Sequence, residues 1–194
     1  MITPEEIRRL EESSDKPIIV LMENAGRLVY ETIKQKQDIS NKKILIVCNH
    51  GNNGGDGLVT ARHLCDESEV DVLFIGEESK MSKETLSNYK KVENNERIQM
   101  LEEESVDFNS YDIIIDAIFG LGFKGTLSDE IKSLIEKINE SSAFKVSIDI
   151  PSGLEINQQP DHVSVQPDLI VTFHDLKPNL QPLKDITVIV DVGL

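Results

Sequence analysis

Short runs rich in isoleucine and valine alternate along this 194-residue chain with segments of helical periodicity, and this alternation limits the folds open to it. The runs are apolar almost throughout, which is typical of strands buried on both faces of a parallel sheet. Helices between such strands supply the crossovers and cover the two faces. The sequence therefore predicts an α/β fold with a mostly parallel central sheet. The predicted strands span residues 43–48, 70–76, 97–101 (an edge strand), 112–119, 144–150, 168–173 and 186–191.

Two helices are expected ahead of the first strand, so that residues 1–40 form a helical N-terminal part and 43–194 the α/β core of a single domain. Thr3 followed by Pro4 is a helix-start signal. In the second helix Glu23 and Asn24 interrupt an apolar stripe, and they either face solvent or contribute to a site. The predicted helices span residues 3–15, 17–36, 58–65, 81–94 (from Ser82) and 127–140 (with Ser128 near its start).

The charge balance restricts the partners of the chain. A net charge of −15, from 35 acidic and 20 basic residues, argues against nucleic acid or an anionic membrane. The absence of a membrane-length apolar run and of a signal-peptide pattern predicts a soluble, cytoplasmic protein. Cys48 and Cys65 are expected as buried thiols rather than as a disulfide. An anionic ligand would need a locally positive feature, such as a helix N-terminus or a bound cation.

Residues 49–57 (Asn-His-Gly-Asn-Asn-Gly-Gly-Asp-Gly) connect the first strand to a helix. Gly and Asn tolerate positive φ. With few side chains in the way, backbone N–H groups can converge on a ligand at the N-terminus of the helix. A tight βα turn is the plain alternative, but such a turn needs one or two glycines rather than four. The segment is therefore interpreted as a ligand-binding loop.

Two more polar or glycine-rich turns follow strands, at 116–126 and 149–153. Ligands of open α/β sheets bind beyond the carboxyl ends of the strands, so the three turns are expected to form one crevice. Residues 120–125 (Gly-Leu-Gly-Phe-Lys-Gly) fit the G-x-G-x-x-G dinucleotide fingerprint, and Asp149 lies near the end of the next strand. A dehydrogenase is disfavoured, because its fingerprint normally follows the first strand and because too few residues follow Asp149 for a substrate domain.

Asn53, Asp116 and Ser152 lie at or just past strand ends on this predicted rim. Amide, carboxylate and hydroxyl oxygens suit a hard cation, and a single carboxylate favours a monovalent one. Separate capping and turn roles for the three residues are equally compatible with the sequence. Asp149 is either held by N–H groups of its turn or tuned as an acid or base. The four histidines have no metal-ligand spacing, and no Ser/His/Asp or Cys/His arrangement can be recognised.

Four motifs in order resemble the NAD(P)HX epimerases, the YjeF N-terminal domain family. They are LMENAG (21–26), GNNGGDGLVTARHL (51–64), DAIFGLGFKGTL (116–127) and DIPSGL (149–154), with Val-Thr-Phe at 171–173 and Lys177 beyond them. The resemblance implies a three-layer αβα Rossmann-like sandwich that is commonly dimeric. It also implies an isomerase that interconverts the C6 epimers of hydrated NADH and NADPH (NADHX and NADPHX). A dehydratase that uses one epimer would then be a separate chain, because the fused dehydratase domain of many bacterial members is absent here.

The resemblance implies roles for individual residues. It assigns potassium to Asn53, Asp116 and Ser152, and it makes Asp149 the candidate catalytic residue, assisting loss and return of the C6 hydroxyl. The family usually has Gly-Pro where this chain has Asn-His at 49–50, a departure that bears on substrate affinity and the pocket rim. The implied substrate-binding residues are Asn52, Asn53, Gly54, Gly55, Asp56, Gly120, Leu121, Gly122, Phe123, Lys124, Gly125, Thr126 and Asp149.

A second function is compatible with the same fold, namely a non-catalytic nucleotide-binding or scaffolding module. Such a module would be expected to lose some of the polar residues that the enzyme needs. Asn53, Asp116, Asp149 and Ser152 are all present, which favours the epimerase.

Overall fold

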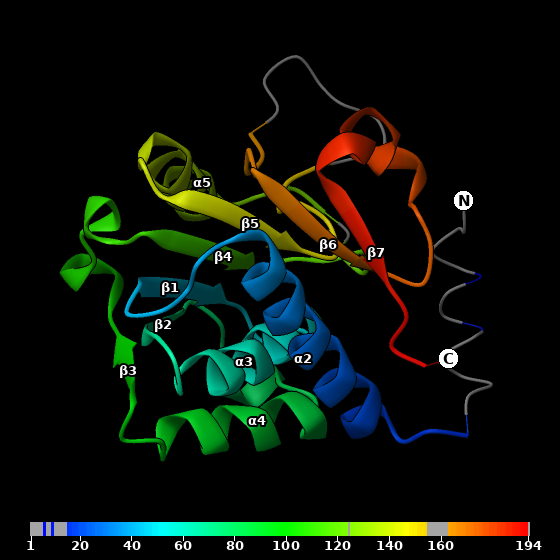
Figure 1. Ribbon diagram of the computed structural model, residues 1–194, viewed down its shortest axis with the longest axis horizontal. Helices are drawn as coiled ribbons and strands as arrows, with labels where there is room; N and C mark the ends of the chain where they lie inside the picture. Colours follow the sequence, from blue (N-terminus) through cyan, green and yellow to red (C-terminus); the bar gives the residue numbers. More distant parts are fainter. Residues whose placement is uncertain (1–5, 7–8, 10–14, 124, 155–162, 194) are drawn as a thin grey trace.

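The computed structural model describes residues 6, 9, 15–123, 125–154 and 163–193 (Figure 1). Its centre is a sheet of seven strands in the order β3-β2-β1-β4-β5-β6-β7, and every neighbouring pair is parallel. The α/β prediction is confirmed, and the sheet is parallel throughout where a mostly parallel one was expected. The strands are β1 (Lys43–Cys48), β2 (Glu69–Phe74), β3 (Ile98–Leu101), β4 (Ile113–Ala117), β5 (Phe144–Ile148), β6 (Leu169–Phe173) and β7 (Thr187–Val190).

Helices cover both faces of the sheet (Figure 1). On one face lie α2 (Ile18–Lys36), α3 (Asn52–Leu64) and α4 (Lys83–Glu93), and on the other lies α5 (Asp129–Glu140). Along each strand, successive side chains point alternately into the two hydrophobic cores, one on each face of the sheet. In β1, for example, Ile46 packs with the residues of α2 and α3 and Val47 with those of α5, and both side chains are fully buried.

The order of the strands reverses between β1 and β4. The chain leads from β1 through α3 outward to β2 and β3, whereas from β4 it leads through α5 the opposite way, to β5, β6 and β7. The two connections therefore leave the sheet on opposite faces, and a crevice forms between the carboxyl ends of β1 and β4. This reversal decides where a ligand can approach the sheet.

Most predicted boundaries hold to within two residues, including β3 at the edge and the caps Ser82 and Ser128, which accept hydrogen bonds from the third residue of α4 and of α5. The predicted start of α3 was wrong, because the helix begins at Asn52 rather than after residue 57. β5 ends two residues early, since Asp149 adopts φ 66° and leaves the strand. The helix predicted over 3–15 lies largely outside the described residues. Short 3-10 helices complete the fold: η1 (Glu78–Lys80), η2 (Glu103–Ser105), η3 (Phe108–Ser110) and η4 (Pro178–Ile186).

The two polar residues in the middle of α2 make structural contacts. The Glu23 carboxylate binds Arg62 (2.8 Å) and His63 (2.9 Å), both on α3. Asn24 donates a hydrogen bond to the carbonyl of Val192 (2.9 Å) and so holds the segment after β7 against α2. Both residues therefore hold neighbouring elements together, a role that neither alternative from the sequence included.

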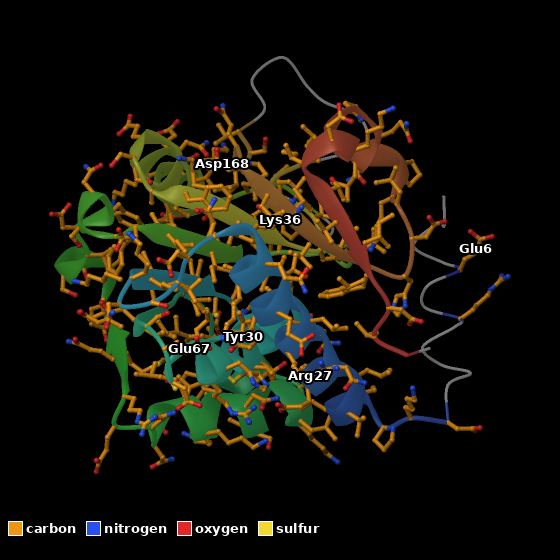
Figure 2. The ribbon with its side chains drawn as sticks, in the orientation of Figure 1. Glu6, Arg27, Tyr30, Lys36, Glu67 and Asp168 are labelled. Atoms are coloured by element: carbon orange, nitrogen blue, oxygen red, sulfur yellow. The ribbon has the colours of Figure 1, made fainter. Side chains whose placement is uncertain are left out.

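A polar contact links α2 to the segment after α3. Tyr30 on α2 donates a hydrogen bond to Glu67, just beyond α3 (2.5 Å; Figure 2).

Cys48 and Cys65 are free, buried thiols. None of the helices in the described part of the chain is long and apolar enough to cross a membrane.

Candidate active site

Asp116 lies on β4 at the reversal of strand order and is 1% exposed. Its Oδ1 accepts hydrogen bonds from Ser152 Oγ (2.5 Å) and Ile118 N (3.2 Å). Its Oδ2 accepts from Ser147 Oγ (2.9 Å) and Ser152 N (2.8 Å). Burial raises the pKa of the Asp116 carboxyl, and these hydrogen bonds oppose the shift. The carboxylate therefore ties the turn after β5 to the end of β4.

Asp149 follows β5 directly, in a left-handed backbone conformation that is uncommon for a residue with a side chain. Its Oδ2 accepts a hydrogen bond from Leu121 N (2.9 Å), in the turn after β4. Its Oδ1 accepts one from Thr172 Oγ1 (3.2 Å) on β6. Strained backbone of this kind is concentrated at functional sites. Here it aims the carboxylate across the ends of three neighbouring strands.

Lys177 is a buried cation, with an exposed fraction of 1%. Its Nζ lies 2.8 Å from Asp149 Oδ1 and donates to Thr172 Oγ1 (2.6 Å) and to the carbonyl of Phe173 (2.7 Å). Three acceptors use all three protons of the ammonium group. A buried ammonium needs such a set of partners. Lys177 therefore balances the charge of Asp149 and fixes the direction of its carboxylate.

Asn53 is the second residue of α3, and its amide is buried without a partner. Neither its Oδ1 nor its Nδ2 has a hydrogen-bond partner among the described residues. A Cβ atom added to Gly120 would lie 3.2 Å from Asn53 Cγ and 3.0 Å from Asp149 Oδ2, so all three residues border one space. Leaving a buried amide unpaired is costly, so a ligand, an ion or a water is expected to complete its hydrogen bonds or coordination.

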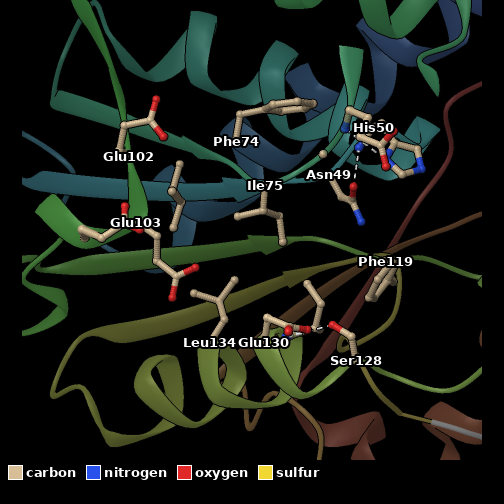
Figure 3. A pocket seen from close by; sticks show the side chains of 15 residues that line it. Asn49, His50, Phe74, Ile75, Glu102, Glu103, Phe119, Ser128, Glu130 and Leu134 are labelled. Atoms are coloured by element: carbon tan, nitrogen blue, oxygen red, sulfur yellow. Dashed lines mark hydrogen bonds between the residues drawn. The ribbon is translucent and has the colours of Figure 1, made fainter. Parts of the chain in front are cut away.

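A cavity of about 530 Å³ opens beside this site, on the α5 side of the sheet (Figure 3). It is lined by residues that follow β1, β2, β3 and β4 and by the first turns of α5. Its size lies in the range of small-molecule sites. The lining residues after β3 are all acidic: Glu102, Glu103 and Glu104.

Comparison with known proteins places the chain in a family. The family described as "YjeF-related protein N-terminus" matches residues 18–179, a range that includes every site residue named above. The chain belongs to this family. A relative from Methanopyrus kandleri, named "Bifunctional NAD(P)H-hydrate repair enzyme Nnr", is 37% identical over 95% of this chain, which spans only 39% of that relative's length. An "NAD(P)H-hydrate epimerase" from Nitrosopumilus maritimus is 33% identical over 86% of this chain and 80% of its own length.

The fold of this YjeF-related chain also matches a solved structure. The crystal structure of yeast ynu0, YNL200c, superimposes with a TM-score of 0.77 over 91% of this chain and 79% of that one. The two sequences are 24% identical, so this likeness supports the fold alone. Together with the strand order, it identifies the sandwich as the one expected from the resemblance.

The glycine-rich segment of the YjeF-related chain is not the left-handed loop that the sequence suggested. Positive φ occurs at none of its glycines. A Cβ atom on Gly54 would lie 1.8 Å from the carbonyl oxygen of Asn49, and one on Gly57 would lie 2.5 Å from Ala117 Cβ. These glycines allow α3 to pack closely on β1 and β4. No side chain caps the N-terminus of α3, so its first N–H groups remain available to an anion.

The fingerprint loop after β4 has a different character. Gly125 has φ 132°, a conformation that side chains rarely permit. Phe123 packs against Phe119 with ring centroids 4.0 Å apart and the rings tilted by 30°, while Gly122 and Thr126 are exposed. Lys124 lies outside the described residues. The other predicted substrate residues are Asn52, Gly55 and Asp56, all in the first turns of α3.

The proposed potassium ligands come from three elements. Asn53 supplies a buried, unpaired amide oxygen, and Asp116 and Ser152 supply hydrogen-bonded oxygens at the neighbouring strand ends. Oxygen donors with a single full charge fit a monovalent cation. In the described part of the chain, no group of three or more His, Cys, Asp or Glu side chains could hold a metal ion, which makes a transition-metal site the poorer fit.

Sequence reasoning assigned no role to three residues of the site, Ser147, Thr172 and Lys177. The two hydroxyl residues are fully buried on β5 and β6, where they interrupt otherwise apolar runs. Such an interruption in a buried strand is a signal that could have marked them. Lys177 carries no comparable local signal, because only the fold brings it to Asp149.

Proposed function

We propose that this chain is an NAD(P)H-hydrate epimerase, an isomerase that interconverts the C6 epimers of NADHX and NADPHX. The observation that carries the proposal is the buried Asp149–Lys177 pair, 2.8 Å between Oδ1 and Nζ, beside Gly120, where an added Cβ would lie 3.0 Å from Asp149 Oδ2. The names of the relatives supply the chemistry that this arrangement would perform.

Epimerisation at C6 requires the C6–O bond to break and to form again on the other face of the ring. As the hydroxyl leaves with the bonding electrons, the ring nitrogen donates its lone pair and C6 becomes planar within a positively charged ring. The Asp149 carboxylate stabilises this charge. When water then adds to C6, Asp149 accepts a proton from it and passes this proton to the departed hydroxide, which becomes water and restores the carboxylate. Lys177 and Thr172 hold the carboxylate in position throughout.

The pyrophosphate of the substrate would bind at the N-terminus of α3, next to the fingerprint loop, where free N–H groups and the helix dipole favour an anion. Asn53, Asp116 and Ser152 would hold potassium. The bound ion would supply positive charge that offsets the acidic surface and helps orient the substrate. We further propose a cytoplasmic homodimer whose activity is coupled to that of an NAD(P)HX dehydratase, in keeping with the two-function relatives.

The test uses the epimer that the dehydratase rejects. Purified protein and a dehydratase are mixed with this epimer, and the return of NADH is followed by absorbance with and without potassium. The proposal predicts acceleration over the spontaneous rate, greater with potassium. No acceleration in either condition would contradict it and would favour a non-catalytic binding module.

Asp149→Asn separates catalysis from binding. The amide keeps the size of the side chain but cannot accept a proton, so the rate should fall by at least about 100-fold, the scale of a lost acid–base group. Substrate binding should be partly retained, because the amide still fits beside Gly120. Full activity of Asp149→Asn would rule out the assigned role, even if the wild-type protein is an epimerase.

A further inference from the structure

The substrate of the proposed function has two halves, and the structure has a separate place for each. Asp149, which would act on the nicotinamide ring, follows β5 on one side of the reversal in strand order. The cavity in Figure 3 lies past the ends of β1, β2 and β3, and Phe119 after β4 and the first turns of α5 close it on the other side. A dinucleotide with its pyrophosphate at the N-terminus of α3 would span the reversal. Its adenosine half would then enter the cavity.

Asn49 offers this cavity an unused hydrogen-bond donor. The side chain is only 7% exposed, and its Oδ1 accepts a hydrogen bond from His50 N (2.8 Å). Its Nδ2 has no partner in the part of the chain that the structure describes, and it points into the cavity toward Phe119 (Figure 3). Gly76 packs against the same amide, since an added Cβ would lie 2.7 Å from Asn49 Oδ1. The amide is therefore held in place and aimed at a ligand.

The lining of the cavity is negatively charged. Its lining carboxylates belong to Glu77 after β2, to Glu102, Glu103 and Glu104 after β3, and to Glu130 on α5. None of the described residues that line the cavity is lysine or arginine. A 2′-phosphate in a dinucleotide site is normally met by arginine, whereas a free ribose hydroxyl is met by a carboxylate. The carboxylates of the cavity therefore match a free ribose hydroxyl rather than a 2′-phosphate.

Nearby cations neutralise only some of these carboxylates. Lys80 pairs with Glu77 (2.5 Å), and Lys137 pairs with Glu103 (2.7 Å). No ion pair joins Glu102 or Glu104 to a cation of the described chain. Their charge is therefore not neutralised by an ion pair within the described chain.

We propose that this cavity binds the adenosine half of the substrate and selects a ribose with a free 2′-hydroxyl, so that the protein prefers NADHX to NADPHX. The identity of the substrate rests on the proposed function, but the selectivity rests on the cavity itself. A carboxylate accepts a hydrogen bond from a ribose hydroxyl, whereas a 2′-phosphate would bring close to two further negative charges against Glu102 and Glu104. Repulsion of this kind discriminates by excluding the wrong ligand.

The experiment measures binding without catalysis. ADP-ribose and 2′-phospho-ADP-ribose are titrated into the full chain by calorimetry at a fixed potassium concentration. ADP-ribose should bind at least about tenfold more tightly, since like charges at this distance repel appreciably even near solvent. Adding choline chloride should narrow the difference, because salt screens exposed charges.

Two double variants carry the same change in charge. Glu102→Gln with Glu104→Gln should reduce the preference for ADP-ribose over 2′-phospho-ADP-ribose at least about threefold. The main cause should be tighter binding of 2′-phospho-ADP-ribose. Glu136→Gln with Glu140→Gln alters two exposed carboxylates of α5 that do not line the cavity, and should leave the preference unchanged. Both pairs are at the surface, so neither is expected to impair folding.

The outcomes separate the two proposals. Equal affinity for the two probes, or no binding of ADP-ribose at millimolar concentration, overturns the inference. So does a preference that the Glu102 and Glu104 variant leaves intact. The protein could also epimerise NADHX and NADPHX at equal rates and bind the two probes equally. That result would support the proposed function and contradict the selectivity. Selective binding without epimerisation contradicts the proposed function and leaves the cavity as a site for ADP-ribose compounds.

Discussion

Lys177 and Asp149 form an ion pair with side-chain exposures of only 1% and 12%, and breaking it should affect both stability and activity. Lys177→Met removes the cation, so that the Asp149 carboxylate loses its charged partner and Thr172 Oγ1 loses its donor. The loss of one partner of a buried pair typically costs about 3–5 kcal/mol, so we expect a fall of that size in the unfolding free energy measured in urea. The rate of epimerisation should fall with it.

The matched variant combines Lys177→Met with Asp149→Asn. If the pair interacts as the distance of 2.8 Å indicates, the double variant should be more stable than the sum of the two single changes predicts, by at least about 1 kcal/mol. Simple additivity would show that Lys177 is held by Thr172 and Phe173 alone. The role assigned to it at Asp149 would then be wrong.

At the scale of elements, the contact between α3 and β1 depends on the absence of a side chain at Gly54. Gly54→Ala would put Cβ 1.8 Å from a backbone carbonyl, and backbone cannot move aside without shifting the helix. We expect a loss of about 3 kcal/mol or more, at the upper end of overpacking costs. Gly122→Ala is the control, because no atom lies within 4 Å of its added Cβ. Similar unfolding midpoints for the two variants would contradict this account of the glycine-rich segment.

The pair of helices α2 and α3 should respond to acid through Glu23. Partial burial raises the pKa of this carboxyl, but hydrogen bonds and charges of Arg62 and His63 outweigh that effect and hold the pKa below its ordinary value of 4.5. A lowered pKa stabilises the fold above about pH 4.5, and that stabilisation is lost as the pH falls through the folded value. Glu23→Gln should therefore cost about 0.5–1 kcal/mol at pH 7, given its partial exposure, and the difference from wild type should shrink below pH 4.5. A constant difference across this range would exclude the ion pair as its cause.

Among the elements, those with a local sequence signal were predicted correctly. β1 was predicted with its observed ends, and Ser82 and Ser128 were placed correctly, because apolar runs and caps are local signals. The start of α3 was wrong because the low helix propensity of glycine favours a loop locally, whereas close packing on Asn49 and Ala117 favours a helix without side chains at those positions. The 3-10 helix η4 was not predicted from the sequence. Contacts across the sheet, such as that of Lys177 with Asp149, are set by strand order and have no local signature.

At the scale of the whole molecule, the proposed potassium site joins the two halves of the sheet. Asn53 belongs to the helix that leads toward β2, whereas Asp116 and Ser152 belong to the half that leads toward β7. An ion bound by all three would stabilise the folded protein and not the unfolded chain. Unfolding in potassium chloride should therefore require more urea than in an equal concentration of sodium chloride, with a gain of about 2.7 kcal/mol at 100 times the dissociation constant.

Asn53→Ala gives this prediction its sharpest form. In sodium chloride the variant should be at least as stable as the wild type, because it removes a buried amide whose Oδ1 and Nδ2 have no partner in the described chain. In potassium chloride the wild type should become the more stable of the two, since only it keeps the amide oxygen for the ion. The wild type is thus expected to be the more stable protein in potassium chloride but not in sodium chloride. An equal gain from potassium in both would mean that the ion binds elsewhere, and a large loss on Asn53→Ala in sodium chloride would mean that the amide has a structural partner.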